Sequence, residues 1–339
     1  MKLRTLVIAA TLMVLSVQSA IAGNLVGYNR VDVPASTDVV FTVPFTQDAG
    51  SDYTVSTVTG SGVTVADTLN VDAFADTYYV RFTSGNGEGL WSTIDSNSAS
   101  EFVLADTGIL SNVSSGDTFT VFPHETLGTA FPDGLEGISF EASPNLITRR
   151  TEILVPSTTS VGINKPASDI YYYFNSEWRK SGQSPVAVFN DTVLPPQTYF
   201  ILRNRGAQTL KLVTLGVVQP VTIQRILPVE SQKNDVPAGT GYPVPVTLAD
   251  LNLGGTPAFQ TTTLLISRKD ELLVFDNTAT GFNKPASAIY YYYNGAWRKS
   301  GASPATSFDD EVLDPASALL IRKAAGTPGS VVWVQPSPI

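Results

Sequence analysis

An internal repeat is the feature that most constrains the fold of this 339-residue chain. Residues 164–182 and 283–301 are identical at 15 of 19 positions, with a constant offset of 119 residues. The match extends upstream, where residues 149–152 (RRTE) correspond to residues 268–271 (RKDE). Because the repeating unit has about 100 residues, the size of a domain, the sequence predicts tandem modules and not a thin solenoid.

A degenerate third copy is predicted in the N-terminal third of the chain. Residues 76–80 followed by Trp91 resemble residues 169–173 followed by Trp178. A second echo, between residues 127–131 and 253–259, suggests where the later units begin. We therefore divide the chain into a signal peptide at 1–22, an N-terminal β-module at 23–126, and two repeat modules at 127–245 and 246–339.

The residue pattern is typical of β-structure throughout. Short runs rich in Thr, Val, Tyr and Phe, such as residues 39–43, 118–122 and 210–213, alternate with Gly, Pro, Asn and Asp. Beyond the N-terminal leader, no long apolar segment has the period of a helix. The predicted fold class is all-β, with tandem antiparallel β-sandwich or barrel-like modules related by internal duplication.

The clearest local prediction is a β-hairpin at residues 290–299. Asn294-Gly295 is the preferred type I′ turn, because both central positions need a positive φ. The earlier copy has Asn175-Ser176, which tolerates the turn less well. This turn predicts the pairs Tyr293–Ala296, Tyr292–Trp297, Tyr291–Arg298 and Tyr290–Lys299.

Two interpretations of this hairpin remain open. In the first, its aromatic rows form a platform on which sugar rings or a partner stack, while arginine donates paired hydrogen bonds. In the second, which we favour, one aromatic face is core and the other is ordinary cross-strand packing. The candidate ligand or partner contacts are Tyr172, Arg179, Tyr291, Tyr293 and Arg298. The candidate repeat core is Trp178, Trp297, Tyr173 and Tyr292.

The N-terminus has the three regions of a secretory signal peptide. Lys2 and Arg4 are positive, residues 6–17 are almost entirely apolar, and residues 20–22 (Ala-Ile-Ala) form a small-x-small cleavage site. The apolar stretch is too short for a membrane span, which takes about 20 residues. We predict cleavage after Ala22, a periplasmic, outer-surface or secreted location, and no transmembrane segment in the mature chain.

The composition excludes several classes of chemistry. With no cysteine, the chain has no disulfides, thiolate metal sites or cysteine nucleophile, and its one histidine, His124, excludes a multi-histidine metal site. No P-loop, zinc-binding HExxH or nucleophile-elbow GxSxG motif occurs. We therefore predict no catalytic residue, no metal and no cofactor, although a pair of carboxylates or a calcium site that forms only in the fold stays open.

The charge of the chain is acidic. Its formal net charge is −9, and it becomes −11 when Lys2 and Arg4 are removed with the leader. An acidic protein repels nucleic acid, so we predict no nucleic-acid partner. Self-assembly and cell-surface polysaccharide are the partners considered.

The chain resembles a family of uncharacterised, exported, repeat-containing proteins that occur as several paralogues in one Gram-negative genome. The resemblance lies in residues 26–28, 43–45, 270–272, 281–285 and 297–299. It covers nearly the whole mature chain. The resemblance implies an exported, non-housekeeping role, and because the family has no assigned activity it implies no functional residue.

The sequence is compatible with three functions. The leading hypothesis is an exported, non-enzymatic structural or surface-associated β-repeat protein. The alternatives are a carbohydrate-binding extracytoplasmic module with an aromatic platform and a carboxylate-dependent glycoside hydrolase. Exposed coplanar aromatic rings would favour the binding module, and two carboxylates about 5–10 Å apart in a cleft would favour the hydrolase.

Overall fold

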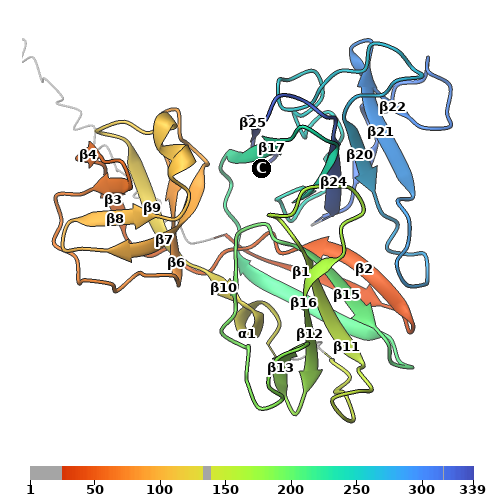
Figure 1. Ribbon diagram of the computed structural model, residues 1–339, viewed down its shortest axis with the longest axis horizontal. Helices are drawn as coiled ribbons and strands as arrows, with labels where there is room; N and C mark the ends of the chain where they lie inside the picture. The colour runs from red at the N-terminus through yellow and green to blue at the C-terminus, as the bar shows by residue number, and fades with distance from the viewer. Residues whose placement is uncertain (1–24, 133–138, 316) are drawn as a thin grey trace, which may run out of the picture.

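The chain folds into three β-lobes (Figure 1). The computed structural model describes residues 25–132, 139–315 and 317–339, so the predicted signal peptide at 1–22 lies outside the described residues. The predicted fold class is confirmed, because the protein is all-β and its strands pair antiparallel. Within the described ranges, no helix is long and apolar enough to cross a membrane.

The N-terminal lobe is a seven-stranded sheet with its own core. Phe82, Phe102 and Phe119 lie at its centre, each at most 1% exposed. A short 3₁₀ helix, η1 (Thr107–Asn112), covers part of this core through Ile109 and Leu110. The strand order is β3 (Asp52–Thr54), β9 (Thr118–Pro123), β6 (Tyr78–Phe82), β7 (Trp91–Asn97), β8 (Glu101–Leu104), β5 (Gly62–Thr64) and β4 (Thr57–Val58).

The other two lobes are each built on a five-stranded sheet, and the two sheets have the same strand order. The first runs β13 (Glu177–Lys180), β12 (Ala167–Phe174), β11 (Thr151–Pro156), β15 (Tyr199–Asn204) and β2 (Thr37–Thr42). The second runs β22 (Ala296–Lys299), β21 (Ala288–Tyr293), β20 (Glu271–Val274), β24 (Ala318–Lys323) and β18 (Asn234–Gly239). Descent of the two lobes from one duplicated module stays a prediction.

Each of these sheets is accompanied by two small strand pairs, and they also correspond. In the first lobe, β1 (Val26–Val33) pairs with β16 (Leu210–Val217), and β10 (Glu125–Thr126) pairs with β14 (Val193–Leu194). Helix α1 (Leu127–Ala130) follows β10 directly. In the second, β17 (Ile223–Val229) pairs with β25 (Gly329–Gln335), and β19 (Val246–Thr247) pairs with β23 (Val312–Leu313). We call the first lobe module 1 (25–46 and 125–219) and the second module 2 (221–335).

The N-terminal lobe is therefore an insertion within module 1, and we call residues 47–124 the inserted domain. The chain leaves module 1 after β2 and re-enters at β10, and the two ends meet where Gln47 Nε2 donates to the His124 carbonyl at 2.7 Å. Module 2 spans the same place with residues 240–245 alone. This differs from the sequence-based division, which grouped β1 and β2 with the lobe at 23–126. The physical reason is that β2 completes a sheet with β15, a partner about 160 residues away along the chain.

The repeated hairpin has the predicted geometry. The register Tyr290–Lys299 through Tyr293–Ala296 is confirmed, and Asn294 and Gly295 have φ of 52° and 73°, as a type I′ turn requires. Trp178 and Trp297 are 1% and 2% exposed, each in the core of its module. One face of each hairpin therefore belongs to a hydrophobic core.

We expect the inserted domain to be separable from the rest of the chain. Because Gln47 and His124 are in contact, a short Gly-Ser linker can replace residues 47–124 without moving β2 or β10. The shortened protein should remain monodisperse in gel filtration and unfold cooperatively in urea, followed by circular dichroism. An aggregated or molten product would contradict the assignment of 47–124 as an insertion.

The core tryptophans predict a large stability effect. Trp297→Ala should lower the free energy of unfolding by about 3–5 kcal/mol, because the indole is 2% exposed and packs on Phe259 with ring centroids 5.0 Å apart. Equilibrium urea denaturation measures this. Val312→Ala, at a residue that is 60% exposed on the same module, is the matched control and should cost well under 1 kcal/mol. Equal losses in the two variants would place the indole outside the core.

Candidate functional site

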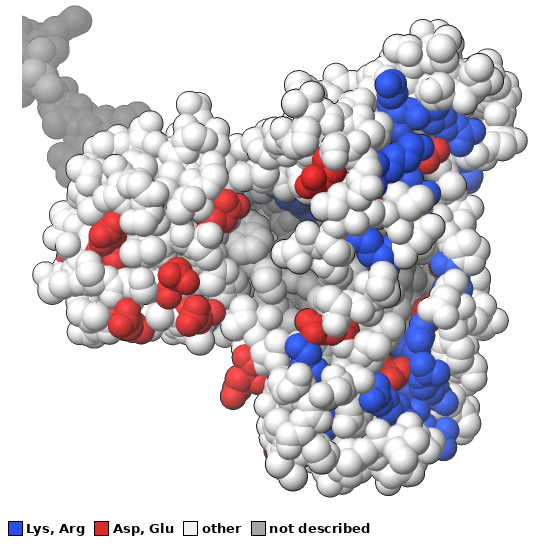
Figure 2. Space-filling view, in the orientation of Figure 1, with Lys and Arg blue, Asp and Glu red and all other residues white. Residues whose placement is uncertain are grey.

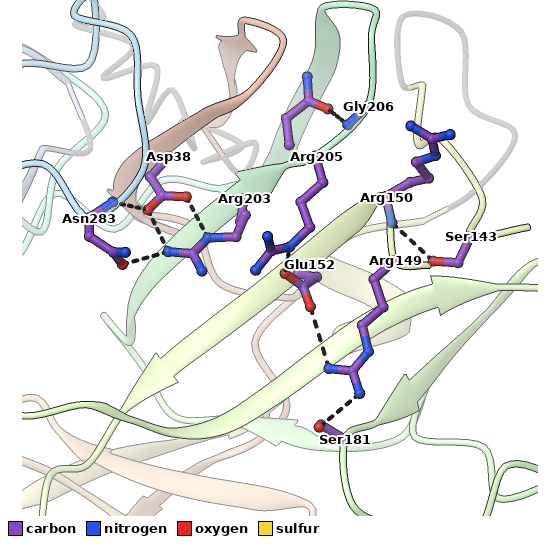
Figure 3. Close-up of polar contacts among 11 residues, drawn as sticks. Asp38, Ser143, Arg149, Arg150, Glu152, Ser181, Arg203, Arg205, Gly206 and Asn283 are labelled. Atoms are coloured by element: carbon purple, nitrogen blue, oxygen red, sulfur yellow. Dashed lines mark hydrogen bonds and ion pairs between the residues drawn. The ribbon is translucent and has the colours of Figure 1, made fainter. Parts of the chain in front are cut away.

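A buried ion pair joins module 1 to a loop of module 2 (Figure 3). Arg203 on β15 donates two hydrogen bonds to Asp38 on β2, from Nε to Oδ1 at 2.8 Å and from Nη2 to Oδ2 at 2.7 Å. Asn283, from the loop between β20 and β21, completes the group: its amide donates to Asp38 Oδ2 and its Oδ1 accepts from Arg203 Nη2, both at 2.7 Å. We call this group the Asp38 clasp.

The reciprocal contact is made by the other module. Arg322 on β24 holds Asp235 on β18 through Nε at 2.8 Å and Nη2 at 3.0 Å. The Asn164 amide donates to Asp235 Oδ2 at 2.7 Å, and Asn164 Oδ1 accepts from Arg322 Nη2 at 3.0 Å. In this Asp235 clasp the loop comes from module 1 and the ion pair from module 2. The modules therefore hold one another by the same contact used twice.

The repeated sequence Gly-x-Asn-Lys-Pro explains how both loops reach their partners. Asn164 and Asn283 adopt left-handed backbone conformations with φ of 52° and 51°, which asparagine tolerates better than most residues. The preceding Gly162 and Gly281 also have positive φ, and their carbonyls accept from the amides of Asp235 and Asp38 at 2.8 and 3.0 Å. No role for these residues was predicted from the sequence, although their identity in both copies was the available signal.

The clasp charges are largely removed from water. The side chains of Asp38 and Arg203 are 5% and 11% exposed, and those of Asp235 and Arg322 are 2% and 16% exposed. Hydrogen bonding to Asp38 raises the pKa of Arg203, and hydrogen bonding to Asp235 raises that of Arg322. Removing one partner would leave a buried charge without compensation, so each clasp depends on all of its members.

The polar network continues across the outer face of the module 1 sheet (Figure 3). Glu152 on β11 accepts from Arg205 Nε at 2.5 Å and from Arg149 Nη1 at 3.4 Å. Arg149 also lies 4.5 Å above the ring of Tyr172. In module 2, Arg268 lies 4.5 Å above Tyr291 in the same way.

Most of the predicted ligand-contact residues are buried or already engaged in contacts within the protein. Tyr172 and Tyr291 are each 4% exposed beneath their arginines. Arg179 and Arg298 donate to the carbonyls of residues 186 and 305 at 2.9 and 3.1 Å, and Arg179 also pairs with Glu177. Tyr293 is half-buried. The five residues therefore do not form an open stacking row on the described surface.

Two of the four predicted core residues lie in each module. Tyr173 and Trp178 pack edge to face, with ring centroids 5.3 Å apart, and Tyr292 and Trp297 do the same at 5.7 Å. Tyr173 is 4% exposed, whereas Tyr292 is only partly buried against the module 2 core. The aromatic residues of the hairpins are thus engaged chiefly in packing.

A cleft of about 990 Å³ lies where the inserted domain meets both modules, and we call it the three-lobe cleft. Figure 2 shows the surface hollowed between the lobe on the left and the rest of the protein. The inserted domain contributes Trp91, Thr93 and Asp106, module 1 contributes Lys165 and Asp169, and module 2 contributes Arg225 and Asp235. The cleft gathers residues from all three lobes, and for that reason no sequence motif marks it.

Most charged groups in the cleft already have partners. Asp169 pairs with Lys180 at 2.7 Å, and Asp235 belongs to a clasp. Asp106 accepts from the Gly108 amide at 2.9 Å, and Lys165 Nζ donates to the Ser160 carbonyl at 2.8 Å. The carboxylates that line the cleft are thus engaged in capping or ion pairs.

Arg225 is the exception. Its guanidinium lies 4.9 Å from the centre of the Trp333 ring, and its Nε and Nη2 atoms are buried without a hydrogen-bond partner. Burial lowers the pKa of Arg225 to about 9. A buried cationic donor without an acceptor is unfavourable, so this residue is the least satisfied group in the cleft wall.

His124 lies behind the cleft and contacts it through Thr93. Its Nε2 is 3.0 Å from Thr93 Oγ1, while its Nδ1 is buried without a partner. A buried N–H without an acceptor is costlier than an unused lone pair, which places the proton on Nε2, donating to Thr93. An imidazole that donates to the hydroxyl does not activate that hydroxyl as a nucleophile. In the described part of the chain, no group of three His, Cys, Asp or Glu side chains could hold a metal ion.

No protein-family model, no curated protein and no solved structure matches this chain. The resemblance to exported multi-paralogue proteins therefore stays a prediction from the sequence.

The buried histidine predicts a pH-dependent stability. Burial lowers the pKa of His124 to about 4, from about 6.5 in the unfolded chain. Between these values the unfolded state binds more protons, so stability that is fully present above pH 6.5 is lost as the pH falls toward 4. From pH 7 to 4.5, the free energy of unfolding should fall about 2–3 kcal/mol more in the unaltered protein than in His124→Gln.

Urea denaturation at the two pH values measures this difference. Burial raises the pKa of the neighbouring Glu125, but that residue is present in both chains, so its titration largely cancels in the comparison. The same pH dependence in both chains would show that His124 is hydrated in the folded protein.

Proposed function

We propose that this is an exported, non-enzymatic, structural or surface-associated β-protein that acts by contact and not by turnover. The observation that carries the proposal is the pair of reciprocal clasps, which joins the two modules into one body. Among the residues that the two copies share are members of the hairpin cores, of the clasps and of the arginine–tyrosine stacks. Folding and docking therefore account for much of the repeated sequence.

The chemistry of the cleft supports contact in place of catalysis. General acid–base catalysis needs a titratable group free to exchange a proton with a substrate. Asp169 and Asp235 are paired with cations, Asp106 caps a 3₁₀ helix, and His124 Nε2 is hydrogen-bonded to Thr93 Oγ1. The glycoside-hydrolase alternative therefore has no support from these carboxylates.

A second candidate function is carbohydrate binding, and a specific observation favours it. Trp91 is half-buried and lines the three-lobe cleft beside hydroxyl groups that include Thr93. An indole face and convergent polar groups are the usual elements of a saccharide site. The expected carbohydrate site is therefore the cleft and not the hairpins, where Tyr172 and Tyr291 lie beneath arginines.

The test is fractionation of native cells with imaging of the protein, followed by assay of the purified mature chain. We expect the protein in the cell envelope or the medium, with Gly23 as its first residue, and no hydrolysis across a panel of polysaccharides and esters. Cytoplasmic protein that retains Met1 would contradict export. Turnover that disappears in Asp106→Asn, with unchanged thermal unfolding, would contradict the non-enzymatic role.

A further inference from the structure

We propose that the three-lobe cleft binds a ligand that carries a carboxylate, and that Arg225 is the residue that recognises this group. The inference rests on the proposed function, action by contact, and names the class of ligand. Three features of the structure support it: the unpartnered edge of Arg225, the aspartates bound by the same edge of two other arginines, and the composition of the cleft wall.

The free edge of Arg225 is the one that binds carboxylates elsewhere in this protein. Arg203 and Arg322 each hold an aspartate through Nε and Nη2, in a fork that matches the two carboxylate oxygens. In Arg225 these two atoms have no partner. Trp333 stacks on the guanidinium but offers it no acceptor for a hydrogen bond.

The fold of the module does not require an arginine at this position. Arg225 on β17 lies opposite Trp333 on β25, and at the corresponding place in module 1 Val26 lies opposite Val217. The two strand pairs are aligned by the matching sequences that end them, residues 217–220 and 333–336. The same ribbon thus forms with valine, so the cation in module 2 needs another explanation.

The acidic residues of the cleft do not supply the missing acceptor. Asp169 and Asp235 are paired with Lys180 and Arg322, and Asp106 accepts from a backbone amide. Lys165, the other cation of the cleft, donates to the Ser160 carbonyl and to Asn234 Oδ1. Among the described residues, no acidic side chain pairs with Arg225, which leaves one cationic fork for an external anion.

Binding requires a movement of the arginine. Nε and Nη2 are covered in this conformation, so an anion in the cleft meets them only after the side chain rotates. No hydrogen bond holds these two atoms in place, and the cleft of about 990 Å³ has room for both the rotated side chain and a ligand. The expected ligand is an acidic sugar, because Trp91 lines the same cleft and can stack on a sugar ring.

The experiment is isothermal titration of the mature protein at pH 7 with D-glucuronate, acetate, D-glucose and inorganic phosphate. We expect saturable binding of glucuronate and competition of acetate with glucuronate. The affinity for glucose should be lower than that for glucuronate by at least about tenfold. Acetate bound as tightly as glucuronate would support the carboxylate site and assign it to small organic acids. No binding of glucuronate or acetate, equal affinity for glucose, or tighter binding of phosphate would overturn the inference.

Three variants test the role of Arg225. Arg225→Gln should lose about tenfold or more in glucuronate affinity, and Arg225→Lys should recover little of it, because lysine lacks the fork. Lys269→Gln, at an exposed residue of module 2, makes the same change in charge and should bind glucuronate normally. Unchanged affinity in folded Arg225→Gln would overturn the inference. If that variant fails to fold, the competition between acetate and glucuronate on the unaltered protein decides.

These outcomes separate the inference from the proposed function. A protein that is exported and without turnover, yet binds no carboxylate, would retain the proposed function and lose only the ligand class. Turnover of glucuronides that requires Asp106 would remove the proposed function, whatever the affinity for glucuronate.

Discussion

The buried pair of Asp38 and Arg203, with the Asn283 loop seated on it, sets the arrangement on which the rest of the molecule depends. A guanidinium and a carboxylate withdrawn from water need hydrogen bonds to compensate for the lost hydration, and here a loop of the other module supplies two of them. The Asp235 clasp repeats the requirement in the opposite direction. Each module thus completes a polar site of its partner, which makes their relative orientation specific.

The orientation of the modules in turn creates the cleft. Asp235 belongs to a clasp and also lines the cleft, and Lys165 follows Asn164 in the docked loop. The inserted domain closes the third side of the cleft.

The inserted domain differs from the modules in its charge. Residues 47–124 contain ten acidic residues and a single basic one, Arg81. In Figure 2 the basic residues gather over the two modules, while the left lobe displays mainly acidic ones. Most of the net negative charge is therefore carried by the inserted domain.

Local patterns in the sequence predicted the local structure well. The Asn294-Gly295 turn and the alternation of the flanking residues were sufficient for the hairpin register, because turn type and pleat determine which residues pair. The division of the chain was beyond such patterns. The whole inserted domain separates β2 from its partner β15 along the chain, and no local pattern in the sequence indicates so distant a partner. The cleft and Arg225 were hidden for the same reason, since three lobes form the wall and the decisive feature is a missing acceptor.

Amide hydrogen exchange in the native protein tests the central claim, that the modules dock through the two clasps, most directly. The Asn283 amide donates to Asp38 and the Asn164 amide to Asp235, both at 2.7 Å and both across the boundary between modules. If the modules form one body, these two loop amides should exchange slowly and respond together when either clasp is weakened. Exchange of both amides at the rate of an unstructured loop, with the sheets still protected, would show that the modules are independent.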